Sequence, residues 1–182
     1  LPGPVGEAVA IAVDAAGAPH LAWTLSGGWN YATQTDGAWT IELRGSRTPV
    51  DLDMAFDSAG NLQVILVHPD AASHSSRWAR KTSAGWADEP LKDFGWARAL
   101  RLDGTTPHVA GTASSSPNLF HSVRDGAAWT PRYLSAGGSP IDADIELALG
   151  GAAELVYLRG ESSWIADRVE IWTVGAGATT SR

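Results

Sequence analysis

The 182-residue sequence contains no cysteine. The chain can therefore form neither a disulfide framework nor a thiolate metal site, and cysteine usage gives no indication of the redox compartment. Lysine is also scarce, because only Lys81 and Lys92 contribute to the 13 basic residues and the rest are arginines. That bias is more typical of genome composition than of a particular chemistry.

An excess of positive charge is missing as well, since the formal net charge is −7. An acidic protein has no electrostatic reason to approach a phosphate backbone or an anionic membrane surface. The longest apolar runs are far too short to cross a bilayer. We therefore expect neither nucleic acid nor membrane among the partners.

The first residues, LPGPVGEA, include neither an initiator methionine nor an apolar signal segment. This opening indicates a processed protein or a piece of a longer one. The sequence leaves localisation open, with a secreted or cell-surface protein as one option.

What the sequence does have is apolar and aromatic character. Hydrophobic residues make up 44% of the chain, and nine tryptophans are among them. This composition predicts a globular protein with a real core. No stretch has a convincing helical period, whereas short segments rich in Val, Ile, Thr, Trp and Tyr are frequent.

One phrase recurs four times, at intervals of about 45 residues. The copies are AIAVDAAGAPHLAW (10–23), DMAFDSAGNLQVIL (53–66), ALRLDGTTPHVAG (99–111) and IELALGGAAELVY (145–157). A tryptophan follows each copy, at Trp39, Trp86, Trp129 and Trp172. Another ring stands eight residues before each of these, at Tyr31, Trp78, His121 and Trp164. These landmarks indicate an internal repeat.

Each copy reads as four short strands separated by Ala-Gly, Gly-Gly or Asp-Gly turn signals. In the first copy the strands are VAIAVD, APHLAWT, WNYATQT and AWTIELR. Four-stranded units of roughly 40–50 residues are typical of a β-propeller, in which each sheet is one blade. The sequence thus predicts an all-β chain that forms a single propeller domain or propeller fragment over 1–182. Its four antiparallel blades are expected at approximately 4–46, 47–94, 95–137 and 138–182.

Four blades either close into a ring or form an arc, and no spare terminal strand is evident that would lock a ring. An arc would expose apolar blade faces, so it would need cover from further chain or from identical subunits. A homo-oligomer, a longer parent chain and a closed four-bladed ring are all open expectations.

Positions that keep the repeat period belong to the blades themselves. His20 and His108 recur in Pro-His pairs, so we assign them to blade architecture rather than to catalysis. The four tryptophan landmarks are assigned to the core for the same reason.

The step Asp14-Ala15-Ala16-Gly17-Ala18-Pro19-His20, with a downstream D-G-x-W, resembles the degenerate repeats of sialidase-like propellers of the BNR or Asp-box type. The box S-x-D-x-G-x-x-W is approached at Ser122, Gly126 and Trp129, with Arg124 in place of the aspartate. Such repeats occur in enzymes, lectins and adhesion modules. The resemblance therefore implies a fold rather than an activity.

Two nearly identical phrases, PVDLDMAFD (49–57) and PIDADIELAL (140–149), open the first strands of blades two and four. First strands line the channel of a propeller, and ligands usually sit on the rim where the connecting loops enter it. Blade three begins with GWARA. Hydrogen-bonding groups beside an aromatic ring suit a glycan or another small polar ligand. We predict a ligand-binding rim formed by Asp51, Asp53, Trp96, Arg98, Asp142 and Asp144.

The acid pairs have two other interpretations. Aspartates at a strand start often accept N–H bonds from the preceding turn, which is a structural role. Carboxylates at this spacing also suit Ca²⁺, the one cofactor considered, with Asp51, Asp53, Asp142 and Asp144 as ligands. The nearby string of His68, Asp70 and His74 fits a solvated loop better than a transition-metal site.

Three functions remain open. Carbohydrate binding, as in a lectin, is preferred, glycoside hydrolysis or polysaccharide lysis comes second, and a protein-interaction scaffold third. Activity like that of sialidases would need an arginine cluster for a carboxylate, a tyrosine nucleophile with a glutamate partner, and an aspartate acid. The rim supplies Arg98 and Arg47 but no evident third arginine. We therefore expect a binding module more than an enzyme, with glycosidase-like chemistry as the alternative.

Overall fold

The computed structural model describes residues 8–70, 74–91, 94–113, 118–134, 139–147, 153–160, 168–174 and 179–181. From residue 135 onward the description covers backbone strands and no side chains. Every regular element in these ranges is a β-strand, which confirms the all-β prediction. The described residues contain no helix with the length and apolarity that a membrane crossing requires.

The strands follow the sequence repeat. The first copy contains β1 (Val9–Val13), β2 (Pro19–Leu25), β3 (Gly28–Thr35) and β4 (Ala38–Arg44). The second contains β5 (Asp51–Phe56), β6 (Leu62–Pro69), β7 (His74–Thr82) and β8 (Gly85–Leu91). The third contains β9 (Trp96–Asp103), β10 (Thr106–Thr112), β11 (Leu119–Asp125) and β12 (Ala128–Leu134). The fourth contains β13 (Ser139–Leu147), β14 (Ala153–Gly160), β15 (Arg168–Val174) and β16 (Thr179–Ser181).

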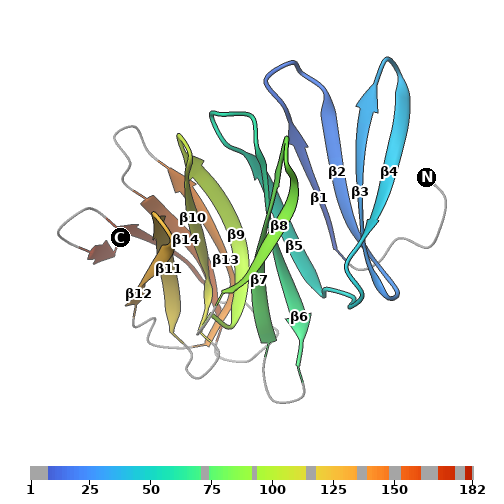
Figure 1. The fold of residues 1–182 in the computed structure, drawn as a ribbon. Helices are drawn as coiled ribbons and strands as arrows, with labels where there is room; N and C mark the ends of the chain where they lie inside the picture. The colour runs from blue at the N-terminus through green and yellow to red at the C-terminus, as the bar shows by residue number, and fades with distance from the viewer. Residues whose placement is uncertain are drawn as a thin grey trace.

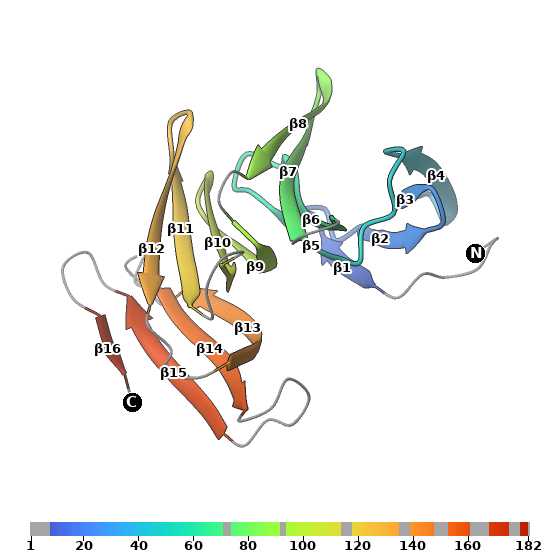
Figure 2. The same cartoon turned by 90° about the horizontal axis from the view of Figure 1, so that it is seen from below.

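Each run of four strands pairs antiparallel, in chain order, into one four-stranded sheet (Figure 1). The inner strands β1, β5, β9 and β13 contact one another in succession. The strands β4, β8 and β12 lie on the outside of the arrangement (Figure 2). This arrangement is propeller-like. The first sheet makes no comparable contact with the fourth, so the described sheets form an open arc. The blade number of the complete propeller and its closure remain predictions.

Short turns join the strands as the Gly signals predicted. Asp36 and Gly37 connect β3 to β4 with φ values of 51° and 79°. Both central residues of a type I′ turn need positive φ, and Asp-Gly accepts this conformation readily. The turn therefore fixes the register in which Thr35 pairs with Ala38.

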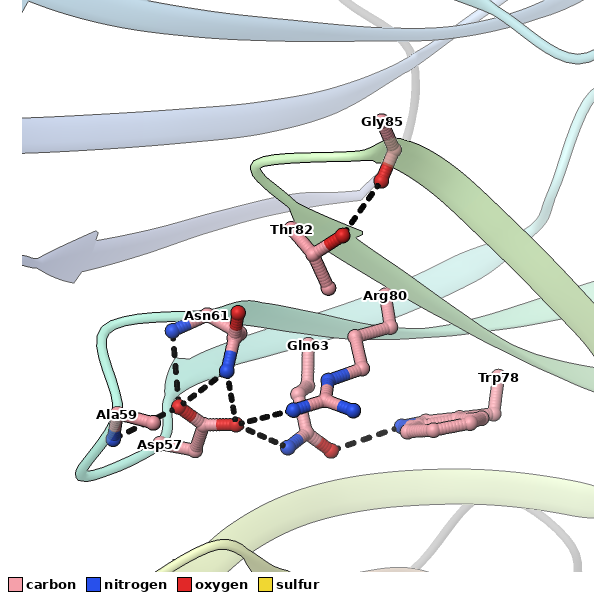
Figure 3. Close-up of polar contacts among 8 residues, drawn as sticks. All are labelled: Asp57, Ala59, Asn61, Gln63, Trp78, Arg80, Thr82 and Gly85. Carbon is pink, nitrogen blue, oxygen red and sulfur yellow. Dashed lines mark hydrogen bonds and ion pairs between the residues drawn. The ribbon is translucent and has the colours of Figure 1, made fainter.

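A hydrogen-bonded chain of side chains crosses the second sheet near the turn between β5 and β6. Oδ2 of Asp57 accepts from Nε2 of Gln63 at 3.1 Å, and Oε1 of Gln63 accepts from Nε1 of Trp78 at 3.0 Å (Figure 3). Asn61 and Arg80 also donate to the Asp57 carboxylate. Burial by itself would raise the pKa of Asp57, but these hydrogen bonds outweigh it and hold the pKa below its ordinary value.

Side chains at corresponding positions of the first and third sheets also contact one another. Oδ2 of Asp14 lies 3.3 Å from Nε2 of His20, whose Nδ1 lies 2.5 Å from the Tyr31 hydroxyl. In the third sheet Nδ1 of His108 lies 3.1 Å from Nε2 of His121. These contacts confirm that the recurring histidines belong to blade architecture. They also explain why the sequence places a ring eight residues before the landmark tryptophans of the first three sheets, at Tyr31, Trp78 and His121.

The second sheet lies between its neighbours and is buried on both faces. Val64 of β6 packs in a core that includes Trp29 of the first sheet. The next residue, Ile65, points to the opposite face and packs in a core that includes Leu100 of the third sheet. Successive side chains of a strand alternate between faces, so a strand with two covered faces reads as one continuous apolar run.

A repeated polar clasp joins consecutive sheets. Glu42 of β4 accepts from the indole N–H of Trp86 at 3.1 Å and is ion-paired with Lys81, both on the second sheet. These bonds, led by that from Lys81, hold the pKa of Glu42 below its ordinary value. At the boundary between the second and third sheets, a glutamate again accepts from an indole and pairs with a basic side chain. Here Glu89 accepts from Trp129 and from Arg124.

The outer face of the first sheet is different, because none of the described sheets covers it. The exposed fractions of Val9, Ile11 and Val13 are 64%, 64% and 58%. Leu43 is 63% exposed, and Trp39 is 39% exposed. The prediction that every landmark tryptophan is core is therefore wrong for Trp39. Trp86 and Trp129 are partly buried against the sheet before their own, whereas no described sheet precedes the first.

Candidate functional site

The predicted rim lies at the end of the arc where β5 and β9 begin. A β-bulge shapes the start of β9. Ala110 of β10 pairs with Ala99, and Gly111 pairs with Ala97, so Arg98 is left out of the ladder. A bulge of this kind redirects the side chain of the extra residue.

The bulge depends on Gly111, although its φ is not in the left-handed region. A Cβ built on Gly111 would lie 2.0 Å from the carbonyl oxygen of Trp96 and 2.8 Å from Cα of Ala97. Only glycine allows this close backbone approach. Gly111, the last residue of the repeat copy ALRLDGTTPHVAG, thus positions the start of β9.

Asp51, Trp96 and Arg98 come together and are called the rim cluster below. Oδ2 of Asp51 accepts from Nε1 of Trp96 at 3.0 Å and from Nη1 of Arg98 at 3.4 Å. The guanidinium of Arg98 lies over the Trp96 ring, 4.2 Å from its centroid. A cation on an aromatic face is an attractive arrangement. All three side chains are partly exposed, so the rim cluster is accessible.

Asp53 lies two residues further along β5 and makes different contacts. Its Oδ2 accepts from the backbone N–H of Leu100 at 2.8 Å and from Nη1 of Arg101 at 3.3 Å. Both partners are on β9, so this carboxylate fastens two inner strands together. Arg101 was not singled out from the sequence, because only the β5–β9 contact brings it near an acid. Asp53 thus has structural partners, although they come from β9 and not from the preceding turn that the structural interpretation of the acid pair named.

Asp142 and Asp144 occupy the corresponding part of β13. Their backbones pair with Leu158 and Val156, after an irregularity between Pro140 and Asp142. β13 contacts β9, the strand that carries Arg98. The side chains of both acids lie outside the described part of the structure, so their roles stay predictions.

Calcium binding also stays a prediction. Among the residues with described side chains, no group of three His, Asp or Glu converges on a point where a cation could be held. A site that used Asp51 and Asp53 would need ligands from the undescribed acids of β13. In the described structure these two aspartates have protein partners instead.

A pocket lies between the first and second sheets, and we call it the arginine pocket. Its volume is about 380 Å³. Residues 45–47 form part of its wall, in the segment that leads from β4 to Asp51. The polar and aromatic groups that line the pocket include Trp29, Arg44, Arg47, His68, Arg77 and Trp86.

Three arginines therefore line one pocket of this protein, although this pocket is not the rim cluster. Arg44 ends β4, Arg47 lies in the following segment, and Arg77 lies on β7. The sequence interpretation considered Arg47 but not the other two. Positions on three different segments of two sheets give no local sequence signal, because only the packing of the sheets brings them together.

The residues of the His68, Asp70 and His74 string do not form a metal site within the described side chains. His68 is 6% exposed and lines the arginine pocket, and Asp70 pairs with Arg47 at 2.5 Å. Burial, reinforced by the charges of Arg47 and Arg77, lowers the pKa of His68. The side chain of His74 lies outside the described residues.

No family model matches the sequence, and no curated protein matches it either. Solved structures do show a similar fold. The hydrazine synthase from Kuenenia stuttgartiensis matches 94% of this chain and 52% of its own, with a TM-score of 0.64 and 12% identity. The intramolecular trans-sialidase from Ruminococcus gnavus matches 85% of this chain and 38% of its own, with a TM-score of 0.58 and 12% identity.

An α-L-arabinofuranosidase from Clostridium thermocellum matches 91% of this chain and 67% of its own, with a TM-score of 0.54 and 11% identity. This chain thus spans about half the length of the hydrazine synthase chain and less of the trans-sialidase chain. At such low identity the similarity concerns the fold alone, and the three proteins carry out different chemistry. The chain therefore has a propeller-like all-β fold, while membership of the BNR or Asp-box family stays a prediction.

Proposed function

We propose that this chain is a propeller recognition module that binds carbohydrate through the rim cluster. The observation that carries the proposal is the arrangement of Asp51, Trp96 and Arg98 at the start of two inner strands. A carboxylate and a guanidinium offer hydrogen bonds to sugar hydroxyls, and an indole offers an apolar face. The trans-sialidase and the arabinofuranosidase with similar folds are consistent with a saccharide ligand.

Hydrolysis is the second candidate, favoured by the same enzymes of similar fold. A glycosidase needs two carboxyl groups, one of which usually has a raised pKa. The pKa values of Asp14, Glu42, Asp57 and Asp70 are all shifted downward by hydrogen bonds or ion pairs. These four acids are held ionised, which suits structural roles, and none of them belongs to the rim cluster.

A glycan array run beside a panel of chromogenic glycosides separates these two functions. A lectin-like module binds a defined set of glycans and releases no chromophore. Release of chromophore by the wild-type chain, absent from an Asp51→Asn variant, would replace the binding proposal by the enzymatic one. If the chain neither binds a glycan nor cleaves a glycoside, the protein-interaction scaffold is the function that remains.

A further inference from the structure

The arginine pocket has a sign of charge opposite to that of the whole chain. Arg44, Arg47 and Arg77 line it, with Asp88 as the acid in its wall, whereas the chain has a formal net charge of −7. Arg77 is paired with Asp88 through Nε and Nη2, at 2.8 Å and 2.5 Å. A guanidinium has five N–H donors, so a paired arginine still has donors for a ligand.

Two buried polar atoms without hydrogen-bond partners belong to residues that line this pocket. These atoms are Nε of Arg44 and Nδ1 of His68. A buried donor or acceptor without a partner costs free energy, so native proteins usually satisfy it with protein, water or ligand. His68 is 6% exposed, and it is one of the residues that line this pocket, which is large enough for a small molecule.

The aromatic walls hold Arg44 in place. Its guanidinium lies 5.0 Å from the centroid of the Trp86 ring, and Trp86 meets Trp29 edge to face at 5.4 Å. Gly45 follows Arg44 in the left-handed region, with φ of 69°. A rigid cation beside two indole rings suits an anionic group attached to a ring-shaped body.

We propose that the arginine pocket binds an oxyanion, a carboxylate or sulfate group, through Arg44, Arg77 and His68. The ligand source is either an acidic saccharide or a free inorganic anion, and the shared chemistry is a compact oxyanion. The saccharide source rests on the proposed carbohydrate function, whereas the oxyanion site does not. The pocket is a separate site from the rim cluster, since none of the rim cluster residues lines it.

Calorimetric titration at low ionic strength tests the site with three probes. Methyl glucuronoside and methyl glucoside differ at a single carboxylate, and sodium sulfate supplies an anion without a sugar. We expect the glucuronoside to bind at least about tenfold more tightly than the glucoside, because charge-assisted hydrogen bonds are stronger than neutral ones. Added salt is expected to weaken this binding. Sulfate binding that competes with the glucuronoside supports the same oxyanion site.

Variants assign the binding to the pocket. Arg44→Gln and, on a different strand, Arg77→Gln are expected to weaken glucuronoside binding about tenfold or more, while melting curves check that each variant is folded. Arg132→Gln removes the same charge from an exposed position on β12 and should bind like wild type. Arg98→Gln, in the rim cluster, should leave oxyanion binding intact and weaken binding of neutral sugars.

The outcomes are distinguishable. Sulfate binding without glucuronoside binding supports the oxyanion site and identifies a free anion as its ligand. Failure of the folded wild type to bind either anion overturns the proposal, while binding of neutral sugars that depends on Arg98 would leave the carbohydrate function standing. Anion binding that is lost in Arg98→Gln but kept in Arg44→Gln also overturns it, because the ligand would then occupy the rim.

Discussion

Trp129 of β12 donates its indole N–H to Oε1 of Glu89 on β8, at 3.0 Å, across the boundary between the second and third sheets. Arg124 donates to the same carboxylate through Nε and Nη2, each at 3.2 Å. The equivalent clasp at the first boundary uses Glu42 and Trp86. A carboxylate three residues after one landmark tryptophan thus accepts from the landmark tryptophan of the next sheet.

Removing this carboxylate should loosen the boundary. Glu89→Ala leaves the Trp129 and Arg124 donors without their acceptor, and we expect a loss of about 1–2 kcal/mol in unfolding free energy. Glu89→Gln keeps an acceptor for the indole and should cost less. Urea unfolding measures both, with Asp125→Ala, an exposed acid on β11, as control. Equal stability of Glu89→Ala and the control would show that the clasp contributes nothing.

The buried histidine pair predicts a pH dependence of stability. Burial, together with the nearby charges of His108 and Arg132, lowers the pKa of His121 to about 4, from an ordinary value of 6.5. Between these two values the unfolded chain binds a proton that the folded chain does not. Stability is therefore full above pH 6.5 and falls as the pH drops toward 4.

Replacement of His121 by glutamine should reduce this slope, because glutamine can bond to His108 and does not titrate. The measurement is the unfolding free energy at a series of pH values from 7 to 4. The gap between wild type and His121→Gln should change by up to about 1.4 kcal/mol per pH unit within the window. Parallel curves across the window would contradict the assignment.

Gly111→Ala should be strongly destabilising, because its Cβ would lie 2.0 Å from the Trp96 carbonyl oxygen. We expect a loss on the order of 3 kcal/mol or more, through loss of the bulge or displacement of β9. Gly126→Ala is the matched control, since a Cβ there meets nothing within 4 Å and only the φ of 57° opposes it. Thermal unfolding should rank Gly111→Ala well below Gly126→Ala, and the reverse order would refute the close-packing argument.

The two acids of β5 should respond differently to substitution. Asp53→Ala leaves the Leu100 N–H without its acceptor, so we expect a loss of about 1–3 kcal/mol in stability. Asp51→Asn should leave the melting temperature nearly unchanged and weaken binding of a glycan identified by array about tenfold. Calorimetry with the two variants compares both properties. If Asp53→Ala were stable but bound glycan poorly, Asp53 would have the binding role that we assign to Asp51.

The uncovered face of the first sheet should drive association of the isolated chain. Contiguous exposed apolar side chains favour contact with another surface, and Val9, Ile11 and Val13 lie on one side of β1. Light scattering should give a mass above 19.1 kDa at high concentration, and Ile11→Lys should return it to 19.1 kDa. The substitution should not lower stability, since Ile11 is already 64% exposed. A wild-type monomer at all concentrations would exclude self-association through this face.

The sequence by itself determined the strands and their grouping. Residue alternation, Asp-Gly turns and the repeat are local properties, so the strands of the first repeat were located to within about one residue of β1, β2, β3 and β4. The repeat also identified His20 and His108 as architectural, because positions that recur serve what the blades have in common. It further brought Asp51, Trp96 and Arg98 to the start of inner strands, where they do meet.

Only the tertiary structure decided what these residues contact. The bulge at Arg98 depends on how β9 pairs with β10. The attachment of Asp53 to Leu100 and the placement of Arg44 and Arg77 around one pocket depend on how one sheet packs against the next. The exposure of Trp39 likewise depends on whether another sheet precedes the first. Such contacts join residues far apart in the chain, and a side chain with the same local sequence is buried, paired or exposed according to its neighbour in space.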